Sequence, residues 1–121
     1  IGSPNGKDYI NNIIGEKINI AGKFALRDIP EIGKYASFAI SMCTGPLHIL
    51  STVNKLPIIA IYGPSDPIRW APKTAIVVQS QLPCVPCLNW AKCDKPMGQR
   101  CMDEIKFERV QQVIENYHLL K

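Results

Sequence analysis

Apolar and polar residues recur along the chain with two different periods, and the change of period predicts strands that alternate with helices. Strands are indicated by short apolar or alternating runs, at residues 18–21, 38–42, 57–62 and 74–78. Helices are indicated by apolar residues spaced three or four apart, at residues 7–16, 25–36, 45–54 and 107–120. This order predicts an α/β fold, in which a parallel sheet is flanked by helices.

Two of these elements carry expectations about burial. The run at residues 38–42 is mostly apolar, which is typical of a strand buried on both faces of a parallel sheet. The last helix is amphipathic, and it places five apolar residues on one side: Phe107, Val110, Val113, Ile114 and Tyr117. We expect this helix to close the domain.

Length and composition are those of one ordinary domain. The chain has 121 residues, of which 46% are hydrophobic, and this is enough for a real core. We expect a soluble protein, because there is no apolar run of the roughly 20 residues that span a bilayer and no signal-peptide pattern. The loop-like start at residues 1–6 is typical of a fragment. The net charge of +4 comes from scattered Lys and Arg, which is compatible with an anionic ligand and more typical of a solvated surface.

The clearest chemistry lies where the run at residues 38–42 stops at Thr44, Gly45 and Pro46 and a helix begins; we call residues 44–48 the central turn. Thr44 or Gly45 suits an N-cap, and Pro46 suits the first helical turn, where its missing N–H removes no bond. This geometry aims backbone N–H groups at whatever lies above the carboxyl end of the strand, which suits a phosphate. A well-capped connection without a ligand explains the turn alone about equally well.

Several segments together resemble one known family. They are Gly22-Lys23, Leu26-Arg27-Asp28-Ile29, Thr44-Gly45-Pro46-Leu47-His48, the strand at residues 57–62, and Gly63-Pro64-Ser65-Asp66-Pro67 followed by Arg69-Trp70. In this order and spacing they resemble the family-9 glycosyltransferases, the ADP-heptose:lipopolysaccharide heptosyltransferases. The resemblance implies a GT-B architecture, of which residues 1–121 form the C-terminal, Rossmann-like, nucleotide-sugar-binding domain. It also implies that the N-terminal domain and the first strand of this domain lie outside the sequence.

The resemblance implies roles for particular residues. The substrate-binding residues would come from the central turn and from the loop after the next strand: Thr44, Gly45, Pro46, Leu47, His48, Gly63 and Asp66. Backbone N–H groups and the Thr44 hydroxyl would meet the diphosphate, and His48 would help stabilise the leaving nucleotide. The family's general base is an Asp of the N-terminal domain, so no catalytic residue is expected in this chain.

The function implied is transfer of heptose from ADP-heptose to the lipopolysaccharide core, by a metal-independent, inverting displacement at the anomeric carbon. The implied partners are the ADP-sugar donor, the lipopolysaccharide-core acceptor and the N-terminal domain, with no nucleic acid. The implied location is the cytoplasm, with peripheral association at the inner membrane, and this chain alone would be inactive. The alternative is a non-catalytic scaffold or interaction module that a four-cysteine metal site stabilises.

Cys43 departs from the family pattern, in which an Asp stands before the Ser/Thr-Gly-Pro turn. A thiol is a weaker hydrogen-bond partner for a sugar hydroxyl than a carboxylate is. The departure leaves open whether the protein uses another sugar, binds the sugar differently or has lost activity.

Four further cysteines lie near one another in the sequence: Cys84, Cys87, Cys93 and Cys101. Their number and the Cys-x-x-Cys pair are compatible with a tetrahedral structural zinc, and the same ligand count would suit an iron–sulfur cluster. The other interpretations are two disulfides, which would be unusual in a cytoplasmic protein, and reduced thiols that pack a loop. We expect no cofactor to be required for catalysis.

Overall fold

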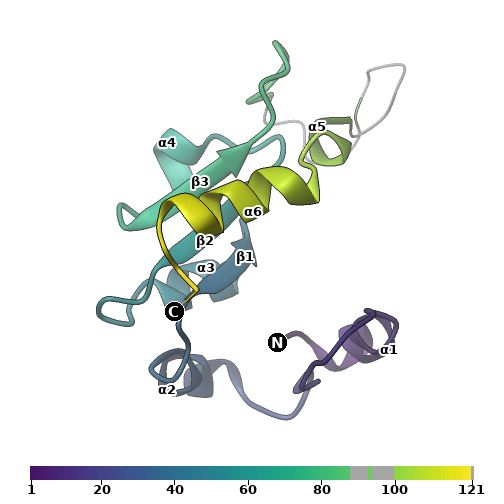
Figure 1. The fold of residues 1–121 in the computed structure, drawn as a ribbon, viewed down its shortest axis with the longest axis vertical. Coiled ribbons are helices and arrows are strands. Elements are labelled where there is room, and N and C mark those ends of the chain that lie inside the picture. The colour runs from purple at the N-terminus through teal and green to yellow at the C-terminus, as the bar shows by residue number, and fades with distance from the viewer. Residues whose placement is uncertain (88–92, 94–99, 121) are drawn as a thin grey trace.

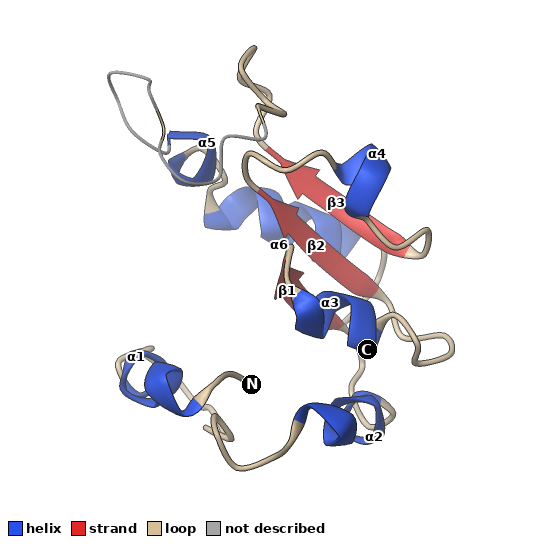
Figure 2. Ribbon diagram, turned by 180° about the vertical axis from the view of Figure 1, so that it is seen from behind, coloured by secondary structure: helices blue, strands red, loops and turns tan. Residues whose placement is uncertain are grey.

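The computed structural model describes residues 1–87, 93 and 100–120. Its centre is a parallel sheet in the order β1 (Ala39–Met42), β2 (Ile58–Tyr62) and β3 (Ala75–Gln79). Helix α3 (Gly45–Leu50) lies on one face of this sheet and α6 (Phe107–Asn116) on the other (Figure 1, Figure 2). The predicted fold class, an α/β fold with a Rossmann-like parallel sheet flanked by helices, is therefore confirmed.

β2 forms the centre of the core, because it has a strand on each side and a helix on each face. All its residues but Ile61 are fully buried, as expected of an apolar run without alternation. Successive side chains point to opposite faces of a sheet, so they divide the core into two clusters. The cluster on the α3 side consists of Ile29, Leu47, Leu50, Leu56, Ile58, Ala60 and Tyr62. The cluster on the α6 side consists of Ile59, Val78, Val110 and Leu119.

β1 lies at one edge of the sheet, and only one of its faces is covered. Ile40 and Met42 are 48% and 42% exposed, so the prediction that this strand is buried on both faces is wrong. Ile40 pairs with Ile59 in the register of the two strands, which places both on the α6 side. The buried strand residues of the α6-side cluster belong to β2 and β3, and this side of β1 is therefore left open.

The predicted last helix is present as α6, and its predicted apolar side is buried in the middle of the helix and not at its ends. Val110 is buried, and Val113 and Ile114 pack against the same cluster. Phe107 and Tyr117 were predicted on that side too, yet they are 72% and 59% exposed. Phe107 begins the helix and Tyr117 follows its last residue, so both lie beyond the part of the helix that contacts the sheet.

The last helix ends at Asn116 rather than near residue 120, because the backbone turns left-handed at His118 (φ 50°). The N–H groups of His118 and Leu119 donate to the carbonyls of Glu115 and Ile114, each at 3.0 Å. This pair of bonds is a Schellman motif, which satisfies the last carbonyls of a helix. It returns the chain toward the sheet, where Leu119 is buried.

The N-terminal part differs most from expectation. α1 (Lys7–Asn11) follows the 3-10 turn η1 (Pro4–Gly6) and is shorter than the helix predicted at residues 7–16. Residues 18–21 form no strand. The Ala21 N–H donates to Asn19 Oδ1 at 3.0 Å and the Asn19 side chain donates to the Lys7 carbonyl at 2.9 Å, while the next residue, Gly22, donates its N–H to the Gly2 carbonyl at 2.9 Å, so this segment is bonded to itself and to the N-terminal part. A strand needs a neighbour for its backbone groups, and this purple segment lies apart from the sheet in Figure 1.

The remaining helices are short. The helix predicted at residues 25–36 is present as the 3-10 turn η2 (Leu26–Asp28) followed by α2 (Ile29–Gly33), and α3 ends at Leu50 rather than at residue 54. Two helices were not predicted, α4 (Pro67–Trp70) and α5 (Arg100–Asp103). Within the described ranges, none of the helices has the length and apolar character needed to cross a membrane.

Candidate functional site

Two loops meet at the carboxyl edge of the sheet. The central turn follows β1 and leads into α3, and residues 63–66, which we call the second loop, follow β2 and lead into α4. β1 and β2 are parallel neighbours, and the Cys43 N–H donates to the Ile61 carbonyl at 3.2 Å, so the two loops leave the sheet side by side (Figure 2). Open α/β sheets bind ligands at this edge. The fold thus brings together both groups of predicted binding residues.

The central turn presents backbone groups to the open edge. Thr44 is extended (φ −145°, ψ 172°) and is the N-cap of α3, but its hydroxyl donates to the Met42 carbonyl at 3.3 Å and does not cap the helix. A Cβ built on Gly45 would meet no atom within 4 Å. The backbone N–H groups of Thr44 and Gly45 donate to no backbone carbonyl among the described residues, as is usual at the start of a helix. The turn therefore offers hydrogen-bond donors beside open space.

The other predicted residues of the central turn lie on different sides of α3. The Leu47 side chain is fully buried in the α3-side cluster, and its N–H donates to the Thr44 carbonyl at 3.1 Å. Pro46 is half-buried in the first turn of the helix, and the His48 side chain is exposed. Leu47 thus serves the core and His48 faces solvent. Their predicted contacts with a ligand stay predictions.

Gly63 is buried, and a side chain at this position would displace Met102. A Cβ at this position would lie 2.5 Å from Met102 Sδ and 4.0 Å from Cys101 Sγ. Real Cβ atoms essentially never approach another heavy atom to within 3.0 Å, so the Met102 side chain would have to move. The second loop is therefore pressed against α5, which carries Cys101 and Met102.

Hydrogen bonds hold the second loop from two further sides. The Gln79 side-chain amide donates to the carbonyls of Gly63 and Ser65, at 2.8 and 2.7 Å. Asp66 is the N-cap of α4, because its Oδ1 accepts from the Ile68 N–H at 2.9 Å, and such a cap stabilises a helix start by about 1 kcal/mol. Gly63 and Asp66 both have structural roles, and their predicted roles in binding stay predictions.

Gln79 and Met102 were missed by sequence reasoning although both shape the second loop. Gln79 pairs with Tyr62 in the register of β3 with β2, so a polar residue at the end of a predicted parallel strand was the available signal. Met102 packs on Gly63 from another part of the chain, and no spacing in the sequence indicates that contact.

A buried hydroxyl lies under the central turn. Tyr62 is fully buried in the α3-side cluster, against which Cys43 also packs. Its Oη has no hydrogen-bond partner among the described residues. Burial raises the pKa of Tyr62 above its ordinary value, and the neighbouring Cys43 thiol raises it further. Cys43, the residue that departs from the family pattern, is thus a neighbour of an unsatisfied phenol.

We expect Tyr62→Phe to increase the free energy of unfolding by about 1 kcal/mol, because it removes a buried polar group that has no partner. The gain should grow above pH 10, the ordinary tyrosine pKa. The pKa of Tyr62 is higher in the folded state than in the unfolded state, so above pH 10 the unfolded chain releases the proton before the folded chain does. The contribution of neutral Tyr62 to the free energy of unfolding of the parent is therefore complete below pH 10 and is lost as the pH rises above it, whereas the Phe variant has no such loss. Urea unfolding at neutral pH and at about pH 10.5 measures both effects.

Tyr35→Phe is the matched control, because Tyr35 is exposed and its hydroxyl is already solvated. The free energy of unfolding of this variant should differ from that of the parent by less than about 0.5 kcal/mol. A Tyr62→Phe variant less stable than the parent would show that the Cys43 thiol and the Tyr62 hydroxyl form a stabilising hydrogen bond.

The state of the cysteines stays a prediction. Cys43, Cys84, Cys87 and Cys101 have free thiols in this structure, and the interpretation of Cys84, Cys87, Cys93 and Cys101 as two disulfides, like that of reduced thiols that pack a loop, is not decided by this. Among the described residues, no group of three or more His, Cys, Asp or Glu side chains is arranged to hold a metal ion. Cys93 is half-buried, and its neighbours on both sides in the sequence lie outside the described residues. The structural zinc stays a prediction.

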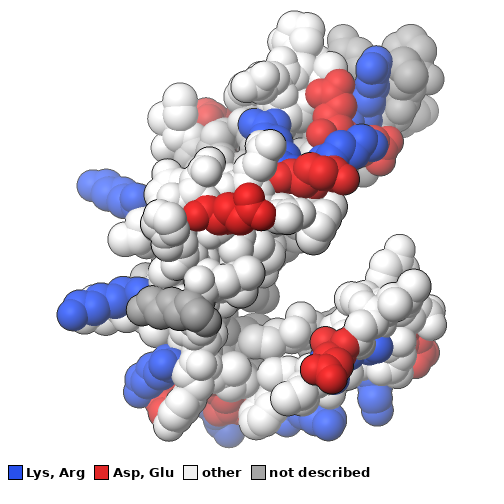
Figure 3. All heavy atoms as spheres, in the orientation of Figure 1, with Lys and Arg blue, Asp and Glu red and all other residues white. Residues whose placement is uncertain are grey.

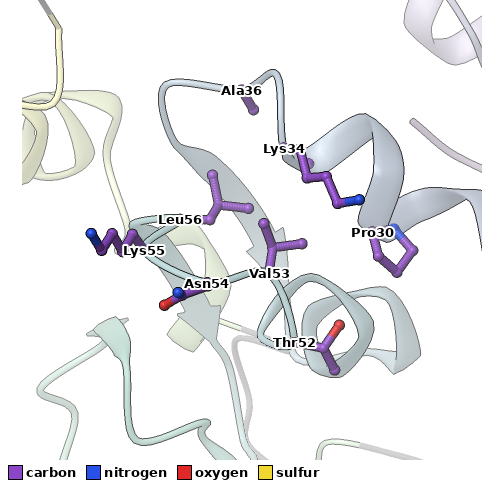
Figure 4. Close-up of a pocket in the computed structure, with 9 residues that line it drawn as sticks. Pro30, Lys34, Ala36, Thr52, Val53, Asn54, Lys55 and Leu56 are labelled. Carbon is purple, nitrogen blue, oxygen red and sulfur yellow. The ribbon is translucent and has the colours of Figure 1, made fainter.

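A groove of about 510 Å³ lies at the opposite end of the sheet, between α2 and the loop that follows α3 (Figure 4). Its walls include Pro30 and Lys34 on one side and Val53, Asn54 and Leu56 on the other. It contains none of the predicted binding residues. The loop that lines the groove leads into β2, so the groove lies at the amino edge of the sheet. Ligands of open α/β sheets bind at the carboxyl edge. We therefore place the candidate site at the two loops.

The distribution of charged side chains on the face that carries α6 does not favour either end of the sheet as a binding site. Acidic and basic side chains are interspersed over this face, without a large patch of one sign (Figure 3). The scattered charge agrees with the interpretation of the net charge of +4 as a solvated surface.

Comparison with known proteins identifies the family. The profile of glycosyltransferase family 9 (heptosyltransferase) matches residues 5–97, a range that includes the central turn and the second loop. The fold and the two loops define an α/β domain with a candidate ligand site at the carboxyl edge of its sheet. The chain belongs to glycosyltransferase family 9, and the resemblance drawn from the sequence is confirmed.

Two curated relatives are both named lipooligosaccharide heptosyltransferase 2. The one from Campylobacter jejuni subsp. jejuni serotype O:6 is 30% identical over 95 residues, which are 76% of this chain and 29% of the relative. The one from serotype O:2 is 28% identical over 108 residues, which are 84% of this chain and 33% of the relative. The chain thus spans about a third of the length of these relatives. No solved structure matches it significantly.

Proposed function

We propose that this chain is the nucleotide-sugar-binding domain of a glycosyltransferase that transfers heptose from ADP-heptose to the lipopolysaccharide core. The observation that carries the proposal is the family match, because it includes both loops at the carboxyl edge of the sheet. The names of the two Campylobacter relatives support heptose as the sugar and a lipooligosaccharide as the acceptor class.

In this proposal the central turn binds the diphosphate of the donor. The backbone N–H groups of Thr44 and Gly45 supply donors, and Gly45, with open space where a Cβ would be, lets the phosphate approach the backbone closely. His48 is exposed in the first turn of α3. A hydrogen bond from its imidazole stabilises the negative charge that develops on the leaving nucleotide as the bond to the sugar breaks.

The rest of the reaction depends on groups outside this chain. The displacement at the anomeric carbon inverts the configuration and needs no metal, and the general base comes from an N-terminal domain that faces this one in a GT-B enzyme. The acceptor is reached at the cytoplasmic face of the inner membrane, where the enzyme associates peripherally. Cys43 offers a thiol where the family has a carboxylate, so the sugar hydroxyls bind other groups.

Titration of this chain with ADP, followed by amide chemical shifts, tests the proposal. We expect the largest shifts at the central turn and the second loop, and tighter binding of ADP than of the control nucleotides UDP and GDP. ADP lacks the sugar, so the experiment examines the nucleotide site alone. A well-dispersed spectrum in which no nucleotide moves these amides at millimolar concentration would overturn the proposed site.

The same sample separates the proposal from its alternative, a non-catalytic scaffold held by a four-cysteine metal site. Near-stoichiometric zinc in the purified protein together with no response to ADP favours the scaffold. A response to ADP favours the donor site whatever the zinc content, because a structural zinc and a nucleotide site are compatible. The family match supports the enzyme over the scaffold.

A further inference from the structure

The backbone carbonyls of the second loop are bonded to other parts of the chain. The Gln79 side-chain nitrogen donates to the carbonyls of Gly63 and Ser65, at 2.8 and 2.7 Å. Between these two residues, the Pro64 carbonyl accepts from the Cys87 N–H at 3.0 Å. One side chain thus uses both of its N–H groups to hold two of three successive carbonyls.

The backbone of the second loop therefore has donors, rather than acceptors, left for a ligand. The Asp66 carbonyl accepts from the Trp70 N–H at 3.1 Å, so the fourth carbonyl of the loop is used as well. The backbone N–H groups of Ser65 and Asp66 donate to no backbone carbonyl among the described residues. The Asp66 carboxylate is an acceptor, and its Oδ1 is bonded to the Ile68 N–H. An anionic nucleotide binds to donors, so the internal bonds of the carbonyls favour its approach to this backbone.

Gln79 reaches the loop from a fixed position at the end of β3. It pairs with Tyr62 in the register of β3 with β2, and Gly63 follows Tyr62 directly. The next residue, Ser80, is buried, and its hydroxyl donates to Glu104 Oε2 at 2.8 Å. The Gln79 side chain is itself half-buried. The sheet on one side and the bond of Ser80 on the other thus hold the residue that holds the loop.

We propose that Gln79 is a positioning residue of the donor site, which keeps the second loop in the conformation that binds ADP. The proposal rests on the proposed function, which places both loops at the donor site. Gln79 acts through the carbonyls of Gly63 and Ser65 and not by contact with ADP. Without its amide, these carbonyls need other donors, and the loop leaves the binding conformation for part of the time. The apparent affinity falls in proportion to the fraction that remains competent.

Gln79→Met tests this role, because methionine is a linear side chain of similar length without a hydrogen-bond donor. We expect ADP affinity, measured by calorimetry on the folded variant, to fall about tenfold, as for a loop that is competent about one-tenth of the time. ADP should still move the amides of the central turn, whereas its effect on the amides of Ser65 and Asp66 should be much smaller than in the parent. A residue that supports stability alone would lower the melting temperature and leave the pattern of ADP-induced shifts unchanged.

Gln81→Met is the matched control, because Gln81 is exposed and lies two residues further along the chain. The substitution is the same, and the carbonyls of the second loop keep their bonds to Gln79. ADP affinity should change by less than about twofold.

Gln79→Glu decides the question if the Met variant does not fold. Its carboxylate has the size of the amide and cannot donate, whereas the protonated carboxyl donates one hydrogen bond. Neighbouring carbonyl oxygens favour the protonated form. The ratio of the ADP affinity of this variant to that of the parent should therefore rise as the pH falls from about 7 to about 5. Groups that titrate in both samples, such as Asp66 and ADP itself, cancel in this ratio.

The outcomes separate this proposal from the proposed function. If the parent binds ADP and Gln79→Met binds it equally well, or if the Gln79→Glu ratio does not depend on pH, Gln79 has no positioning role and the donor site stands. If the parent itself does not bind ADP, the proposed function is wrong, and the role of Gln79 in donor binding is wrong with it.

Discussion

Leu47→Ala is expected to lower the free energy of unfolding by about 2–5 kcal/mol, because it leaves a cavity where a fully buried side chain fills the space between α3 and β2. A domain of this size is stable by about 5–15 kcal/mol in total. The variant therefore loses a large part of its stability, and its melting temperature should fall by about 10 °C or more. Urea unfolding followed by circular dichroism measures the change.

His48→Ala is the control, because His48 is the next residue of the same helix and is exposed. Its free energy of unfolding should change by less than about 0.5 kcal/mol. Equal losses in the two variants would contradict the assignment of Leu47 to the core. Leu47 and His48 were both predicted to contact the ligand, and the comparison shows which of the two also supports the core.

Gly45→Asp is expected to weaken ADP binding by at least about tenfold while the domain stays folded. The new carboxylate would stand at the start of α3, where the proposal places a diphosphate, and two like charges about 5 Å apart repel by about 3 kcal/mol at an effective dielectric constant near 20. The fold should tolerate the change, because no atom lies within 4 Å of the added Cβ and an acidic residue is favourable at a helix N-terminus. Isothermal titration calorimetry with ADP measures the loss.

Gly6→Asp makes the same change of charge at a glycine that is equally open. Gly6 is the N-cap of α1, and α1 lies apart from the sheet in Figure 1, so ADP affinity should change less than about twofold. If Gly45→Asp binds ADP as the parent does and both variants are folded, the central turn is not the phosphate site.

The sheet could be predicted from the sequence because its strands are encoded locally. The apolar run at residues 57–62 matches β2, and the run at residues 74–78 matches β3 within one residue. The turn after β1 was also predictable, since Thr44, Gly45 and Pro46 together signal a helix start. Each of these segments carries its own signal and needs no information about distant neighbours.

The errors lie where the outcome depends on a neighbour. Ile18 sits in an alternating run, but a strand requires a partner and residues 18–21 have none among the described residues. Ile40 is as apolar as Ile59, yet it remains exposed because the buried α6-side cluster lies over β2 and β3 and leaves that side of β1 open. The contact of Met102 with Gly63 joins residues far apart in the sequence. The identity of the binding residues came from the family resemblance, since the turn alone was equally consistent with a plain connection.

The different positions of β1 and β2 in the sheet give the two loops different mechanical properties. β2 is central and buried along its length, whereas β1 has a neighbour on one side and an open face. Local opening costs least at the edges of a structure and most at its centre. The second loop is thus anchored to the stiffest element of the domain, and the central turn to one that opens more easily. If the proposed donor binds between the two loops, we expect the central turn to adjust its position and the second loop to stay in place.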